Sequence, residues 1–191
     1  MKNKVLIIVS GTASGKSTVI RELVKKHKFK EVKYFTTKPK RNEFDNDYHF
    51  VSDEKFYDML ESGKFIEFRK YFVNVKTPEG KTRKALWKYA TAKTLKVDNT
   101  LQVMQLPIDA GVEVYKYLNE QAVLIYLDCD ESIRRERALK RGDLEEEVDR
   151  RILSDRKFAK MSEQNCHRIV PSDRKLEEVV QDVLEGFEFF N

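Results

Sequence analysis

Cysteine is scarce in this chain of 191 residues, and its two cysteines, Cys129 and Cys166, lie far apart in the sequence. Their spacing matches neither a cluster of metal-ligating thiolates nor a disulfide framework. The sequence therefore excludes a small disulfide-stapled fold and a cysteine-based zinc site, and it predicts a protein of the reducing cytoplasm.

Long apolar runs are also missing. The longest one near the start, "VLIIV" in "MKNKVLIIVSG", has five residues and leads into a Gly-Lys motif rather than a cleavage site. Nothing else in the sequence approaches the length of a membrane span. Internal repeats and low-complexity tracts are absent as well, so we expect a globular protein without a membrane partner.

Charge of one sign is in small excess, with 37 Lys+Arg against 32 Asp+Glu and a formal net charge of +5. The excess is spread along the whole chain rather than gathered in one block. Such a balance favours a phosphorylated small molecule at least as much as a polyanion, so nucleic acid is not the expected partner.

The composition, 40% hydrophobic and 36% charged, is that of a folded chain, and its length suits one domain with insertions. Short β-rich runs alternate with helical patterns, which is typical of an α/β fold with a parallel sheet flanked by helices. We expect strands at 4–9, 31–35, 100–106, 122–127 and 167–170. Apolar stripes at helical spacing predict core residues at Val19, Ile20, Leu23, Val24, Leu176, Val179, Val180, Val183, Leu184 and Phe187.

The alternation breaks between residues 36 and 91. This segment holds a helix pattern, "DEKFYDMLESG", capped by Ser52 or Asp53, and a two-strand pattern closed by "TPEGK". We interpret it as a mixed α+β insertion in a core formed by residues 1–35 and 92–191.

The motif that carries chemistry is "SGTASGKST", directly after the first expected strand and before an expected helix. A phosphate cradle needs inward backbone N–H groups, a helix N-terminus, a lysine, and a hydroxyl for Mg²⁺. The sequence supplies these, although Ser10 stands where the motif has its first glycine, and we expect Gly11 to absorb the turn. The expected phosphate-binding residues are Gly11, Thr12, Ala13, Ser14, Gly15, Lys16, Ser17 and Thr18, with Ser17 as the metal ligand.

Three basic segments provide further candidates. "TTKPKRNEFDNDYHFVS" places cationic and phenolic donors around a second phosphate site, namely Lys38, Lys40, Arg41 and Tyr48. "SIRRERALKRG" and "EEEVDRRI" flank an acidic turn, and if both are helices, several arginines converge there as in a lid of about 137–151 over a triphosphate. Salt bridges along helix surfaces are the alternative for most of these arginines.

In order along nearly the whole chain, these motifs resemble the guanylate kinases. The P-loop is followed by "TTK…R…YHFVS", a "FIE" strand at 65–67, Tyr89-Ala90-Thr91, "IDAG" around Gly111, and an arginine-rich segment from 137 to 151. The resemblance implies a P-loop kinase fold that phosphorylates a nucleoside monophosphate with ATP and Mg²⁺.

Residue by residue, the resemblance implies that Lys38, Arg41, Tyr48 and Tyr89 hold the acceptor phosphate. Glu67 would accept hydrogen bonds from the acceptor base, and Thr91, in the same turn motif as Tyr89, is a further expected substrate-binding residue. It also implies that Lys16 binds the ATP phosphates. The lid residues Arg137 and Arg151 would stabilise charge during transfer, and Arg141 would lie at the adenine side.

The sequence departs from the family at base-reading positions, with Tyr34 in place of a serine and Ile108 in place of an aspartate. It also has Lys38 in place of an arginine. The acceptor base can therefore be guanine or another, possibly modified, deoxynucleotide base. Two alternatives stay open: a guanylate-kinase-like interaction module without catalysis, and a kinase of another small phosphorylated acceptor such as a sugar phosphate.

Overall fold

The computed structural model describes residues 5–40, 42–46, 48–76, 80–93 and 100–190. The chain forms two compact units. Unit 1 comprises Met1–Val32 and Val97–Asn191, and unit 2 comprises Lys33–Lys96.

Unit 1 is built on a parallel sheet with the strand order β2-β7-β1-β8-β9. β1 lies at its centre and is buried at every position, which explains its continuous apolar run. The strands are β1 (Val5–Ser10), β2 (Lys30–Glu31), β7 (Gln102–Leu106), β8 (Ala122–Asp128) and β9 (Arg168–Pro171).

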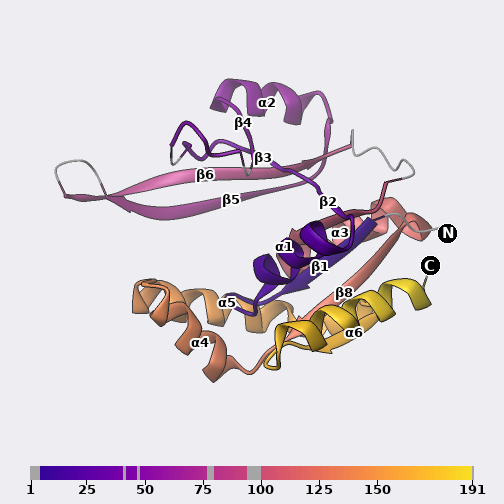
Figure 1. The fold of residues 1–191 in the computed structure, drawn as a ribbon. Coiled ribbons are helices and arrows are strands. Elements are labelled where there is room, and N and C mark those ends of the chain that lie inside the picture. The colour runs from indigo at the N-terminus through magenta and orange to yellow at the C-terminus, as the bar shows by residue number, and fades with distance from the viewer. Residues whose placement is uncertain (1–4, 41, 47, 77–79, 94–99, 191) are drawn as a thin grey trace. The chain divides into compact units, whose positions relative to one another are not determined.

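Helices cover both faces of this sheet (Figure 1). One face carries α1 (Lys16–Lys26) and α6 (Leu176–Phe189), whose apolar stripes pack with Leu6 and Ile8 in the main core. On the other face, α3 (Ile108–Leu118) approaches β1 so closely that a Cβ on Gly111 would lie 2.1 Å from Val9 Cγ1. The remaining elements are the 3₁₀ turn η1 (Asn119–Gln121), α4 (Glu131–Lys140) and α5 (Glu145–Asn165).

Unit 2 contains a sheet with the order β4-β3-β6-β5, in which β5 and β6 form a long antiparallel hairpin. Its strands are β3 (Phe35–Thr36), β4 (His49–Phe50), β5 (Phe65–Lys76) and β6 (Thr82–Ala92). The hairpin follows the expected two-strand pattern, whereas residues 77–79 of "TPEGK" lie outside the described part of the chain.

A single helix, α2 (Asp53–Glu61), covers one face of this sheet (Figure 1). Ser52 caps it by accepting a hydrogen bond from the Lys55 amide at 3.2 Å. Phe56 packs with Phe65 and Ala90 in a small core, and buried Lys88 forms an ion pair with Asp53. These contacts show that α2 packs on one face of the sheet. It does not cover the opposite face.

Two expectations from the sequence need correction. The strand expected at 31–35 is divided between the two sheets, because the chain leaves β7 after the Val32 amide bonds to Val103 and joins β6 at Phe35. Val24 lies on the outer side of α1 and is 40% exposed, so it is not a core residue.

No helix in the described ranges is long and apolar enough to cross a membrane.

Candidate active site

The loop between β1 and α1 has the shape of a phosphate cradle, but its strained positions differ from those expected. Positive φ angles occur at Ala13 (61°) and Gly15 (95°), and neither Ser10 nor Gly11 has one. Serine is therefore compatible with the loop, and Gly11 does not absorb the turn. A Cβ on Gly11 would lie 2.5 Å from Arg134 Nη1, so a side chain there would displace the guanidinium.

Lys16 begins α1 and its side chain folds back over the loop. Its ammonium donates hydrogen bonds to the Ser10 carbonyl (2.8 Å), the Ser10 hydroxyl (2.7 Å) and the Gly11 carbonyl (3.1 Å). Burial lowers the pKa of Lys16 from 10.5 to about 8, against the opposing influence of Asp155, while Arg134 adds to the lowering. The Ser10 hydroxyl is thus a side-chain acceptor for the amine that a glycine would lack.

The sequence motifs do not predict the ion pair between Arg134 and Asp155, which contacts the phosphate-binding loop. Asp155 on α5 accepts a hydrogen bond from the Thr12 amide at 2.6 Å and pairs with buried Arg134 at 2.9 Å. Arg134 Nε also donates to the Cys129 carbonyl. Asp155 lies four residues after Arg151, so a helical wheel puts both on one side of α5, but no local motif identifies its partner.

A cavity of about 700 Å³ opens over the loop in unit 1. The residues Thr12–Thr18 form its base, and Val19, Leu176 and Val179 form an apolar wall. The wall residues were expected only as core, but they also face this cavity. Five arginines line it: Arg21, Arg137, Arg141, Arg151 and Arg174.

Two groups can be separated among the arginines of α4 and α5. Arg137, Arg141 and Arg151 lie on the cavity, as the lid hypothesis requires. Arg135 instead forms ion pairs with Glu145 and Asp149, and Arg150 forms one with Glu147. The salt-bridge alternative therefore holds for Arg135 and Arg150. Arg21 and Arg174, which also reach the cavity, were missed because no motif links them to the loop.

The cavity arginines are held by weak or short-range contacts. Arg137 donates to the Ser172 carbonyl at 3.4 Å, and Arg151 forms an ion pair with Glu147 at 2.7 Å. Arg141 pairs with Asp143, which lowers the pKa of that carboxyl chiefly through this hydrogen bond. Such contacts at a surface hold a guanidinium in place without neutralising a cavity that carries several of them.

Ser17 is the candidate metal ligand. Its hydroxyl donates to Gln105 Oε1 at 2.9 Å, and Gln105 Nε2 donates to Glu31 Oε1 at 3.2 Å. Hydroxyl, amide and carboxylate oxygens are the hard donors that suit Mg²⁺ held partly by substrate phosphates, so the residues fit this ion. Across the described ranges, no cluster of three or more His, Cys, Asp or Glu side chains forms a site for a metal held by protein alone.

In unit 2, the expected acceptor residues gather on the sheet face opposite α2. Tyr48 and Tyr71 each pack edge-on against Tyr89, with ring centroids 5.8 and 5.9 Å apart. The Lys38 ammonium lies over the rings of Tyr48 (5.6 Å) and Trp87 (5.7 Å). This face therefore combines a cation with partly buried aromatic rings. Arg41, the other expected phosphate ligand, lies outside the described residues.

Tyr89 is held as a neutral hydroxyl. Burial, followed by nearby Tyr48, raises its pKa to about 12, although a hydrogen bond with the Thr36 side chain acts in the opposite direction. At neutral pH the phenol therefore keeps its proton and can donate a hydrogen bond to an anion.

Glu67 and Thr91 meet on the same face. Thr91 Oγ1 donates to Glu67 Oε1 at 2.6 Å, and both residues are almost fully buried. Arg69, which the sequence analysis did not single out, pairs with the same carboxylate at 2.8 Å. Burial opposes the charge on Arg69, but Glu67 and Tyr71 raise its pKa above the ordinary value.

Comparisons with known proteins agree on one family. The sequence pattern that describes guanylate kinase matches residues 2–188. The guanylate kinase of Prochlorococcus marinus subsp. pastoris is 26% identical over 192 residues, which is 97% of this chain and 98% of that protein. The guanylate kinase of Clostridioides difficile is 37% identical over 78 residues, or 39% of this chain and 38% of its own length.

The fold is also similar to that of a solved structure. A crystal structure of guanylate kinase from Anaplasma phagocytophilum has a TM-score of 0.67, with 16% sequence identity, and the likeness covers 98% of this chain and 85% of that one. Together with the phosphate-binding loop and the cavity arginines, the matched pattern leads to one conclusion: the chain belongs to the guanylate kinase family and is an ATP-dependent nucleoside monophosphate kinase.

Proposed function

We propose that the acceptor of this kinase is GMP or dGMP, and that the donor is ATP complexed with Mg²⁺. The observation that carries the donor side is the cavity in which Lys16 and three lid arginines surround the loop. The relatives named above are guanylate kinases, which supports guanine as the acceptor base.

On the donor side, the loop amides and Lys16 would bind the β- and γ-phosphates. Arg137 and Arg151 would stabilise the charge that develops on the transferring group, and Arg141 would contact the donor near its adenine. The apolar wall of Val179 and Leu176 suits a flat ring such as adenine. Mg²⁺, held through Ser17 and the phosphates, would neutralise charge on the phosphate oxygens.

On the acceptor side, Lys38, Tyr48 and Tyr89 would hold the monophosphate, together with Arg41. Lysine supplies a point charge where the family has the arginine fork, so the hydroxyl of neutral Tyr89 becomes a more important directional donor. Glu67 and Thr91 would lie at the base end of the same sheet face.

Phosphoryl transfer requires the protein mainly to position the two substrates and to stabilise charge. A phosphoryl group passes between oxygens in line through a loose transition state, so fixed donors and cations provide most of the catalysis. No general base is required for such a transfer.

A coupled ADP-release assay tests the proposal over ribo- and deoxynucleoside monophosphates and a sugar phosphate. We expect GMP and dGMP to be the fastest acceptors. Lys16→Ala should abolish transfer while circular dichroism stays that of the wild type, because this side chain contacts the loop rather than the core. Lys25→Ala, on the outer part of α1, is the matched control and should retain full activity.

Each failure has its own meaning. Faster transfer to another monophosphate would refute guanine as the acceptor base. Transfer to a sugar phosphate alone would refute a nucleotide acceptor. Full activity of Lys16→Ala would refute the assignment of the loop.

A further inference from the structure

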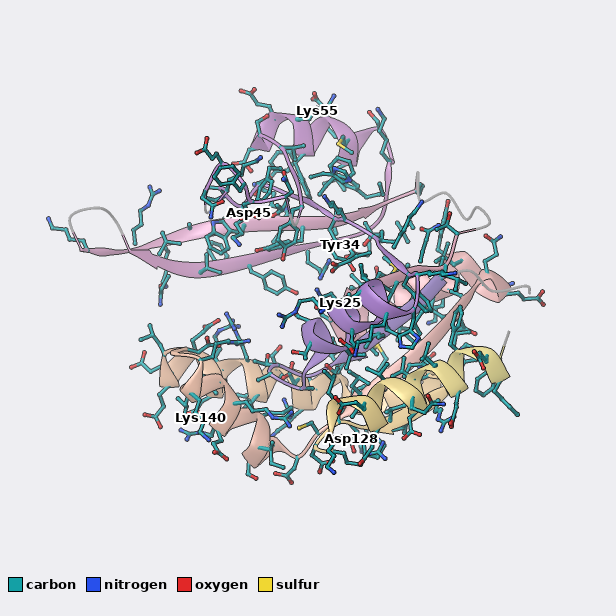
Figure 2. All side chains as sticks on the ribbon, in the orientation of Figure 1. Lys25, Tyr34, Asp45, Lys55, Asp128 and Lys140 are labelled. Atoms are coloured by element: carbon teal, nitrogen blue, oxygen red, sulfur yellow. The ribbon has the colours of Figure 1, made fainter. Side chains whose placement is uncertain are left out.

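Arg69 occupies a position on β5 from which it can read a nucleotide base. Glu67, Arg69 and Tyr71 alternate along the strand and therefore share a face, and across the hairpin they are paired with Thr91, Tyr89 and Trp87. This is the face opposite α2. In Figure 2, Tyr34 and the α2 residue Lys55 lie on opposite sides of the unit 2 strands.

The Glu67 carboxylate is already engaged on this face. Arg69 Nε donates to Oε2 at 2.8 Å and Nη2 donates to Oε1 at 3.1 Å, which is the two-pronged arrangement of an arginine with a carboxylate. Thr91 adds a third donor on Oε1 at 2.6 Å. A carboxylate accepts about four hydrogen bonds, so Glu67 has about one position left and cannot take two adjacent N–H groups of guanine.

Arg69, unlike Glu67, keeps most of its hydrogen-bonding capacity for a ligand. Its guanidinium carries five N–H donors in a fork, and only two of these are directed at Glu67. Its side chain is 13% exposed, against 1% for Glu67, so the arginine is the member of the pair that reaches the surface. The outer edge of the guanidinium can therefore meet a ligand while its inner edge is fixed.

The surroundings favour a base over a phosphate at this point. Glu67 balances the charge of Arg69, so a doubly charged phosphate would meet a nearly neutral pair, and its own charge would be opposed by the carboxylate. A neutral base suffers no such repulsion. Tyr34 and Tyr71 lie close enough to influence the Arg69 charge, and aromatic rings beside a guanidinium suit a flat base.

We infer that Arg69 determines base specificity by donating to two adjacent acceptor atoms of the base, and that Glu67 is a positioning residue which orients the guanidinium. In guanine these acceptors are O6 and N7, the pair that arginine contacts with both prongs in nucleic acids. This inference rests on the proposed function and names the edge by which its acceptor is recognised.

Binding to the full-length chain can be measured through Trp87, the only tryptophan in the sequence, which lies two residues from Tyr89 on the same face. The probes are GMP, IMP, 7-deaza-GMP and ribose 5-phosphate. IMP lacks the 2-amino group but keeps O6 and N7, whereas 7-deaza-GMP lacks N7. We expect IMP to bind within about threefold of GMP, and 7-deaza-GMP to bind about tenfold more weakly.

Three variants complete the test. Arg69→Gln should weaken GMP by about tenfold or more and remove the difference between GMP and 7-deaza-GMP. Arg69→Gln leaves the buried Glu67 carboxylate without its ion-pair partner and can therefore prevent folding. In that case the double variant Glu67→Gln with Arg69→Gln is used instead, and the same loss of GMP affinity is expected. Arg83→Gln, an exposed arginine on the same hairpin, is the matched control and should bind all four probes normally.

The results that overturn the inference differ from those that overturn the proposed function. Binding of 7-deaza-GMP equal to that of GMP, with IMP far weaker, would assign recognition to Glu67 instead. Equal weakening of all four probes in Arg69→Gln would mark a phosphate contact, and unchanged binding would exclude Arg69 altogether. CMP, whose O2 and N3 are adjacent acceptors, is a fifth probe for the wild type and Arg69→Gln. If the wild type binds CMP alone and loses it in Arg69→Gln, guanine is refuted as the acceptor base and the role of Arg69 stands.

Discussion

Lys16 and Ser10 are joined twice, because the Lys16 ammonium donates to both the carbonyl and the hydroxyl oxygen of Ser10. The residue that departs from the glycine of the usual motif therefore contacts the side chain on which the motif depends. This relationship explains how the loop accommodates serine: its backbone needs no positive φ at that position, and its hydroxyl lies against the lysine.

The first prediction concerns proton uptake. Lys16 has a pKa of about 8 in the free protein, so part of the population is neutral above that pH, and bound phosphates should raise the pKa. ATP binding should thus take up protons between pH 8 and 9 and little at pH 6.5. Calorimetry in two buffers of different ionisation enthalpy measures this uptake, and Lys16→Arg, always charged, should show none; equal uptake in that variant would contradict the assignment.

The second prediction separates the arginines of α4. Arg137→Ala should lower kcat by about 10³-fold or more and change the KM for ATP little, since an arginine on the transferring group acts mainly in the transition state. Arg135→Ala, which removes only pairs with Glu145 and Asp149, should leave both constants near the wild-type values. A higher KM with unchanged kcat would make Arg137 a ground-state binding residue.

The third prediction concerns the acceptor face of unit 2. Tyr89→Phe should raise the KM for the acceptor by about five- to tenfold without changing the KM for ATP, because it removes one hydroxyl donor. Tyr57→Phe on α2, the opposite face, is the control. Since burial raises the pKa of Tyr89 to about 12, its loss should also leave the pH profile between 6 and 9 unaltered. An unchanged KM for the acceptor in Tyr89→Phe would exclude Tyr89 as a ligand of the acceptor phosphate.

The fourth prediction tests packing behind the site. Gly111→Ala would place a methyl group 2.1 Å from Val9 Cγ1, so α3 or β1 must shift. We expect the free energy of unfolding in urea to fall by about 1–3 kcal/mol. Glu113→Ala, two residues along on the exposed side of α3, should change it by less than about 0.5 kcal/mol. An unaffected Gly111→Ala would show that this contact is not tight.

The sequence by itself determined the class of the fold and the location of the phosphate loop. Both depend on local regularities: apolar runs of strand length, helical periodicity, and a contiguous Gly-Lys-Ser motif. The same locality explains the cap at Ser52, which is fixed by its own helix. Where the signal was short, as in residues 31–35, pairing partners decided instead, and the run was divided between β2 and β3.

Only the tertiary structure decided which charged residues work together. Arg135 and Arg137 are two residues apart with the same side chain, yet one is tied to α5 carboxylates and the other lines the cavity. Asp155 meets the Thr12 amide across 143 residues of sequence, and Glu67 is occupied by Arg69 rather than left open. Contacts between residues so far apart in the sequence produce no periodic pattern in it. Each contact depends on where two separate elements pack, and this packing is set by the whole chain.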